Sequence, residues 1–115
     1  MAEVKPRPKV LDGETHKIAV GCGSLFVSIN FNEDKPFEVF AKLGKSGGCA
    51  ACFTESLTRA ISVGLRAGIP LSEYYDHLRD IQCPSPTVSE GEQIKSCPDA
   101  IAKVIKKFIK DEVKE

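Results

Sequence analysis

Hydrophobic and polar residues alternate in the first half of the chain with the two-residue period of β-strands. In residues 25–31 leucine, valine, isoleucine and phenylalanine occupy every second position, and residues 37–43 repeat the pattern. A shorter apolar stretch over residues 16–20 precedes them, and short polar or glycine-containing segments separate the three. Strands buried on one face produce this period. The pattern predicts three strands joined as an antiparallel meander.

In the second half of the chain, apolar residues recur at the three- and four-residue spacing of amphipathic helices. This spacing predicts a first helix from Cys49 to Gly68 and a second from Pro70 to Cys83. A polar loop follows, and a third helix has Cys97 at its N-cap. The predicted buried positions are Phe53, Leu57, Ala60, Ile61, Gly64 and Leu65 in the first helix, Leu71, Tyr74 or Tyr75, Leu78 and Ile81 in the second, and Ile101, Val104, Ile105, Phe108 and Ile109 in the third.

The succession of elements predicts an α+β fold, in which a three-stranded antiparallel meander is followed by three helices packed on one sheet face. A chain of 115 residues is long enough for one compact domain. Residues 1–14 contain two prolines and are expected to form an extended N-terminal arm. Residues 15–115 are expected to form the single domain.

Charge and hydropathy narrow the classes of partner. Sixteen basic and sixteen acidic side chains cancel, which argues against nucleic acid as a partner. No apolar run approaches the roughly 20 residues that a membrane helix needs. The polar start of the chain lacks the apolar region of a signal peptide. We therefore expect a cytoplasmic protein that does not bind membranes.

The five cysteines are the most informative chemical groups of the chain. In the reducing cytoplasm they are not expected to form disulfides, which leaves buried thiols, a redox pair or a thiolate metal site. All but Cys52 fall at the ends of predicted elements, and amide groups at a helix N-terminus stabilise a thiolate. Four thiolates around one ion form the usual closed zinc site. The candidate metal ligands are Cys22, Cys49, Cys83 and Cys97.

Three other interpretations of the cysteines stay open. Cys49 and Cys52 form a C-x-x-C pair at the start of a helix, which is the arrangement of a thiol redox site. The four candidate ligands could instead hold an iron–sulfur cluster, since cysteine serves both kinds of site. Cysteine also packs as a small buried hydrophobic residue.

Several blocks of the sequence together resemble the TSCPD domain, which is best known near the C-terminus of adenosylcobalamin-dependent (class II) ribonucleotide reductases and also occurs in small stand-alone proteins. The resemblance extends from about Lys17 to Ile109, with Lys95 in the place of the threonine that gives the domain its first letter. The blocks are CGSLFVSIN, PFEVFAKLGKSGGCA, RAISVGLRAGI, the residues Ile81-Gln82-Cys83, and SCPDAIAKVI.

The resemblance implies the same four cysteines, Cys22, Cys49, Cys83 and Cys97, as the matching set, and it leaves Cys52 as an extra one. It implies a stand-alone accessory or binding domain whose partner is a ribonucleotide reductase or another nucleotide enzyme. The catalytic barrel of the reductases, its radical-generating cysteines and its cobalamin site have no counterpart in a chain of this length. We therefore expect no catalytic activity of the domain itself.

Overall fold

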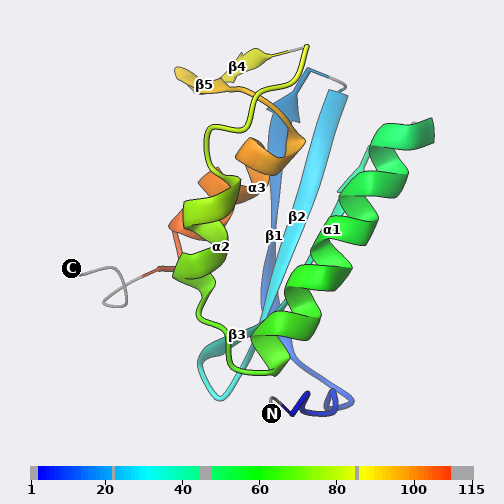
Figure 1. Ribbon diagram of the computed structural model, residues 1–115, viewed down its shortest axis with the longest axis vertical. Coiled ribbons are helices and arrows are strands. Elements are labelled where there is room, and N and C mark those ends of the chain that lie inside the picture. The colour runs from blue at the N-terminus through cyan, green and yellow to red at the C-terminus, as the bar shows by residue number, and fades with distance from the viewer. Residues whose placement is uncertain (1–2, 22, 45–47, 85, 110–115) are drawn as a thin grey trace.

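The computed structural model describes residues 3–21, 23–44, 48–84 and 86–109, with the backbone alone for residues 48–50 (Figure 1). In these residues a three-stranded sheet forms one layer and helices cover one of its faces, as the sequence predicted. The order of elements along the chain is β1 (Asp12–Val20), β2 (Gly23–Asn32), β3 (Lys35–Leu43), α1 (Gly48–Arg66), α2 (Leu71–Leu78), β4 (Thr87–Ser89), β5 (Glu92–Ile94) and α3 (Cys97–Lys106).

The sheet is an antiparallel meander in the order β1-β2-β3, and its register follows the alternation in the sequence. Val27 pairs with His16 on one side and with Ala41 on the other, so the apolar positions of the strands share the face beneath the helices. Leu25, Val27 and Ile29 are fully buried there. The strand β1 begins at Asp12, which lies within the range assigned to the N-terminal arm.

The arm before β1 is held against the opposite face of the sheet by an ion pair. Arg7 Nε lies 3.0 Å from Glu38 Oε1, and the same carboxylate accepts a 2.6 Å hydrogen bond from Asn30 Nδ2. Glu38 is only 1% exposed as a result, although the alternation placed it on the solvent-facing side of its strand. The charge of Arg7 makes this burial tolerable, because a buried carboxylate needs both a counter-ion and hydrogen bonds.

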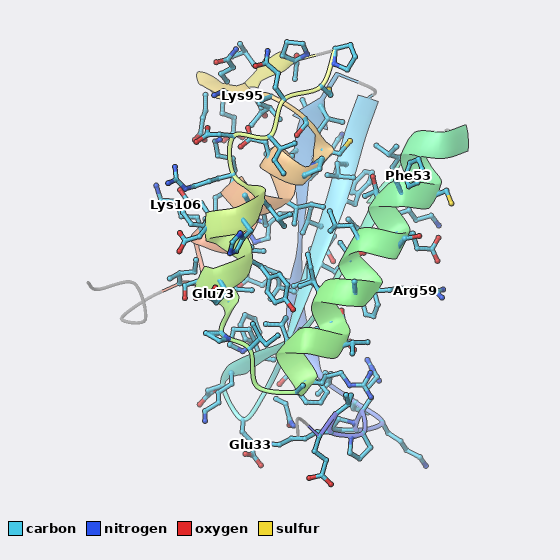
Figure 2. All side chains as sticks on the ribbon, viewed as in Figure 1. Glu33, Phe53, Arg59, Glu73, Lys95 and Lys106 are labelled. Atoms are coloured by element: carbon cyan, nitrogen blue, oxygen red, sulfur yellow. The ribbon has the colours of Figure 1, made fainter. Side chains whose placement is uncertain are left out.

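The helix α1 packs along β3, which is the strand at one edge of the sheet. Two of its predicted buried positions are wrong: Phe53 is 71% exposed and points away from the sheet in Figure 2, and Ala60 is exposed as well. The buried face instead carries three hydroxyl groups, those of Thr54, Thr58 and Ser62, together with Ile61 and Leu65.

The hydroxyl groups of α1 face the sheet because β3 has unpaired backbone groups at its outer edge. Ser62 Oγ donates a 2.7 Å hydrogen bond to Val39 O and accepts one of 2.9 Å from Val39 N. Ala41 N donates to Thr58 Oγ1 at 3.3 Å. Buried backbone groups must be paired, so polar residues are more favourable here than the apolar ones that periodicity alone would select.

The helix α2 is shorter than the sequence predicted. Its last residue is Leu78, because Arg79 is extended and Asp80 adopts a left-handed conformation with φ +66°. Ile81, predicted on the buried stripe, therefore lies outside the helix and is 44% exposed. Cys83 lies in the irregular segment that follows rather than at the end of the helix.

The predicted loop before the last helix contains a small hairpin, in which β4 and β5 pair from Thr87↔Ile94 to Ser89↔Glu92. The predicted buried face of α3 is confirmed, since Ile101, Val104 and Ile105 are at most 1% exposed. Phe108 and Ile109 follow the helix and still pack against the core.

Candidate metal site at the N-terminus of α3

The N-terminus of α3 is fixed by a serine. Ser96, one residue before the predicted position, is the N-cap, and its Oγ accepts a 3.1 Å hydrogen bond from Asp99 N. The same Oγ donates a 2.5 Å hydrogen bond to Ile81 O. Cys97 is the first residue of the helix and packs against the buried core. The serine therefore joins the start of α3 to the segment that leads into Cys83.

A fully buried carboxylate connects the same two segments. Asp99 is 0% exposed, and its Oδ1 accepts hydrogen bonds from Asp80 N at 2.7 Å and Lys103 Nζ at 2.8 Å. Its Oδ2 accepts a third from Lys95 N at 2.9 Å. We call Asp80, Lys95, Asp99 and Lys103 the Asp99 cluster. Sequence reasoning placed the aspartate only in the first turn of the helix, although its spacing of four residues from Lys103 is the spacing of a helical ion pair.

Electrostatics favour the ionised form of Asp99. Burial by itself raises the pKa of this carboxyl group, but the hydrogen bonds from Lys103 Nζ and from the backbone N–H groups of Lys95 and Asp80 outweigh it. The pKa of Asp99 therefore lies below the ordinary value for an aspartate. The cluster is a charged, fully hydrogen-bonded support beneath the N-terminus of α3.

The Asp99 cluster brings Cys83 next to the segment that carries Cys97. Cys83 N donates a 3.0 Å hydrogen bond to Lys95 O, two residues before Cys97. Both cysteine side chains are partly buried. Two candidate ligands from separate parts of the chain thus lie on adjacent backbone segments, one of which is the first turn of a helix.

The other two candidate ligands fall on or beside residues that the structure does not describe. Cys22 lies outside the described residues, and Cys49 is described only by its backbone, in the first turn of α1. The end of β3 is fixed beside the start of β2, because Gly44 N donates a 2.7 Å hydrogen bond to Ser24 O. Figure 1 shows the end of β1, the starts of β2 and α1, and the start of α3 at the same, upper end of the molecule.

A family comparison adds to this geometry: the model of the TSCPD domain matches residues 2–109. The chain belongs to the TSCPD domain family. Residues 95–99, Lys-Ser-Cys-Pro-Asp, correspond to the five-residue motif that names the domain, and their contacts indicate what the motif does. In this TSCPD domain Lys95 replaces the threonine. Its backbone N–H and C=O groups bind Asp99 and Cys83, and its side chain adds an ion pair, with Nζ 3.3 Å from Asp80 Oδ1. The replacement of the side chain therefore leaves those two hydrogen bonds in place.

Curated relatives of this TSCPD domain are much longer proteins named vitamin B12-dependent ribonucleotide reductase. The one from Streptomyces clavuligerus is 24% identical over 108 residues, which are 93% of this chain and 11% of the relative. The one from Bradyrhizobium diazoefficiens is 30% identical over 77 residues, 66% of this chain and 6% of the relative. The chain thus spans about a tenth of the length of such relatives. No solved structure matches it.

The fifth cysteine of the TSCPD domain is separate from the Cys83–Cys97 pair. Cys52 lies on α1, one turn after Cys49, and its side chain is exposed. Among the described residues no three histidine, cysteine, aspartate or glutamate side chains are grouped as metal ligands. The side chains of Cys22 and Cys49 lie outside the described part of the chain, so the four-cysteine site stays a prediction. Within the same residues, no helix is long and apolar enough to cross a membrane.

Proposed function

We propose that this TSCPD domain is an accessory binding domain, without catalysis of its own, built around one structural zinc ion. Its ligands would be Cys22, Cys49, Cys83 and Cys97. The observation that carries the proposal is the hydrogen bond from Cys83 N to Lys95 O, which sets Cys83 beside the first turn of α3 and Cys97.

The residues around Cys83 and Cys97 suit a thiolate ligand. Cys97 begins a helix whose first amide groups favour negative charge. The carboxylate of Asp99 is paired with Lys103, so its charge is compensated and does not add to the negative charge of a thiolate site. Bound zinc would supply a cross-link between the strands and the helices, and binding of this kind contributes directly to folding free energy. In a small domain that contribution is a large part of the stability.

The metal content of the full chain tests the ligand set. Anaerobically purified protein should contain one equivalent of zinc, and each of the four ligand variants, in which one cysteine is replaced by serine, should lose it. Cys52→Ser is the matched control and should retain the metal, because it removes a cysteine that the proposal does not use. Metal loss in Cys52→Ser, or equal metal content in all variants, would contradict the proposal.

Two other outcomes of the same experiment point to the remaining interpretations of the cysteines. Iron with acid-labile sulfide in place of zinc would indicate an iron–sulfur cluster on the same ligands. A metal-free protein that cycles between dithiol and disulfide would indicate the redox pair of Cys49 and Cys52, and Cys52→Ser would then abolish the cycling. Either result rejects the zinc site.

For the partner, we propose a ribonucleotide reductase or another enzyme that acts on nucleotides. The support is the family membership and the printed names of the relatives, in which a similar domain is part of a vitamin B12-dependent ribonucleotide reductase. Sedimentation of a mixture of this chain with the reductase of its own organism should show a complex. Independent sedimentation of the two at all concentrations would reject this partner.

A further inference from the structure

The face of the main sheet that lies away from α3 is covered only at one end. The helix α3 packs against the opposite face, which carries Val27. The N-terminal arm covers the end at Glu38, whose carboxylate binds Arg7. Toward the other end of the same face two aromatic side chains reach the solvent, since Phe26 is 37% exposed and Phe40 is 40% exposed. An exposed ring is a surface on which another flat ring can stack.

The register of the sheet brings the two rings together. Phe26 of β2 lies opposite Lys42 of β3. Phe40 lies opposite Ser28, two residues further along β2. The rings are therefore diagonal neighbours, a separation that aromatic side chains can bridge. The ring of Phe26 lies over Gly44, where an added Cβ would be 3.2 Å from Phe26 Cε2. The two rings and the small Ser28 thus form one continuous surface.

A cleft of about 450 Å³ lies on this surface. It is lined by Phe26, Ser28 and Phe40 of the sheet, and Arg59 of α1 borders it. A cavity of this size is within the range of ligand sites in proteins. The helix α1 therefore forms a wall on one side of the two rings.

Two lysines flank the ring of Phe26. Lys17 of β1 and Lys42 of β3 both lie directly opposite Phe26, one on each side. Lys17 Nζ is 5.9 Å from the centre of the ring. In the described part of the chain neither lysine forms an ion pair. The row of three residues across the sheet therefore has a cation on each side of an aromatic ring.

The acidic residues of this face do not cancel the two lysines. Glu38 is 1% exposed and is paired with Arg7 of the arm. Glu55, which lines the cleft from α1, has its carboxylate 2.8 Å from Arg59 Nη2. No other acid of the described strands or of the cleft lining belongs to this face. The face therefore keeps two positive charges, although the chain as a whole is neutral.

We call Lys17, Phe26, Phe40 and Lys42 the stacking face, and we propose that it binds single-stranded nucleic acid. Bases stack on the two rings, and the neighbouring phosphate groups lie beside the two lysines. Proteins that bind single strands without sequence preference combine aromatic rings with cations in this way. The neutral net charge of the chain, on which the expectation against nucleic acid rests, averages over all faces and does not describe this one. The proposal does not depend on the zinc ligands.

The two lysines limit how strongly binding depends on salt. Each phosphate group of a single strand that a cation neutralises contributes about −0.7 to the slope of log K against log salt, so two groups give about −1.4. Stacking on the rings supplies the rest of the binding free energy. Duplex nucleic acid should bind more weakly, because its bases are stacked on one another and do not reach the rings.

Fluorescence anisotropy of labelled oligothymidine and oligouridine of about ten nucleotides tests the proposal on the full chain. The two strands should bind alike, because the stacking face recognises bases and phosphate groups and not the sugar. Phe26→Ala and Phe40→Ala should each weaken binding at least about fivefold, because each removes a stacking ring. Phe53→Ala is the matched control and should bind unchanged, since Phe53 is 71% exposed on α1 and points away from the sheet in Figure 2.

The lysines give a second readout, which does not depend on the folding of the phenylalanine variants. Lys17→Gln combined with Lys42→Gln should bring the salt slope close to zero, and both side chains are exposed, so the core is left intact. Lys106→Gln is the matched control, because Lys106 Nζ also lies over a ring, 5.7 Å from the centre of Tyr75, but on α3. Its salt slope should equal that of the native chain.

Binding of duplex DNA or inorganic polyphosphate as tightly as the single strand would overturn the proposal, since charge alone would then explain it. So would unchanged affinity in both phenylalanine variants, or no binding at about 1 mM protein. Concentration-dependent self-association that Phe40→Ala abolishes would show that a second copy of the chain occupies the stacking face, and it would also reject nucleic acid.

Discussion

Replacing Asp99 by asparagine tests the cluster that holds residues 80–83 against the N-terminus of α3. Asparagine has nearly the same shape, but it carries no charge and presents one amide nitrogen where the aspartate has a second acceptor oxygen. If its oxygen keeps the hydrogen bonds from Asp80 N and Lys103 Nζ, its NH₂ group faces Lys95 N, a donor facing a donor.

The loss of stability follows from the burial of the group. Asp99 is fully buried, so Lys95 N loses its acceptor inside the protein, and Lys103, whose side chain is 17% exposed, loses its counter-ion with only partial access to water. One unsatisfied buried donor costs about 1–3 kcal/mol, and a hydrogen bond to a charged group is worth about 1.5–3 kcal/mol. We expect Asp99→Asn to lower the free energy of unfolding by about 3 kcal/mol in sum.

Urea unfolding at neutral pH measures this change. With a slope of about 1.5 kcal/mol/M, a loss of about 3 kcal/mol moves the midpoint down by about 2 M. Asp76→Asn is the matched control, because Asp76 is an exposed residue of α2, and its effect should stay within about 0.5 kcal/mol. An equal and small shift in both variants would refute the reasoning about the Asp99 cluster.

The pH dependence of the free energy of unfolding gives a second test of the role of Asp99. Because the folded pKa of Asp99 lies below its unfolded value, the carboxylate stabilises the fold at pH values above about 3.9. This contribution is lost as the pH falls through the folded pKa. The stability difference between the native chain and Asp99→Asn should therefore be constant near neutral pH and shrink below about pH 4. A difference that grows on acidification would contradict the direction of the shift.

Two further substitutions test the packing of α1. Ser62→Ala leaves Val39 N and Val39 O without a partner in the core and should cost about 1–3 kcal/mol in urea unfolding. Ser56→Ala, an exposed serine on the same helix, should change stability by less than about 0.5 kcal/mol, and equal effects would count against the pairing. Gly64→Ala should destabilise the fold despite the higher helix propensity of alanine, because the added Cβ would meet the hydroxyl of Tyr74. Tyr74→Phe should relieve part of that loss, and a stabilising Gly64→Ala would contradict the contact.

The strands and the last helix could be predicted from periodicity because one face of each is buried and the other is not. Residues 25–31 and 37–43 alternate cleanly, and the register of the sheet follows from that alternation. The start of α3 was predicted from Pro98, which fits the first turn, although the N-cap is Ser96 and not Cys97 as predicted. Local signals of this kind do not depend on the rest of the fold.

The predictions of the buried face of α1 and of the end of α2 were wrong where contacts with a distant part of the chain determine the structure. Thr58 and Ser62 of α1 are buried because they hydrogen-bond to the edge of β3, whereas Phe53, which periodicity placed on the buried face, is 71% exposed. The end of α2 depends on Asp80, whose amide is bound by Asp99 from a later helix. Neither contact produces a periodic pattern of apolar residues in the sequence.

The four-cysteine site stays a prediction. Its residue set came from the positions of the cysteines at element ends and from the resemblance to the TSCPD domain. The structure adds the contacts of Ser96, Asp99 and the backbone of Lys95, which position Cys83 beside the N-terminus of α3. Spacing along the sequence could not have revealed the contacts of Ser96 with Ile81 and of Asp99 with Asp80, because these residues are 15 and 19 positions apart.

X-ray absorption at the zinc edge of the purified full chain tests the four-cysteine site most directly, because it counts the ligand atoms around the metal. The account predicts one shell of four sulfur atoms at about 2.3 Å. A shell containing nitrogen or oxygen atoms, or a chain that binds no metal at all, would contradict it.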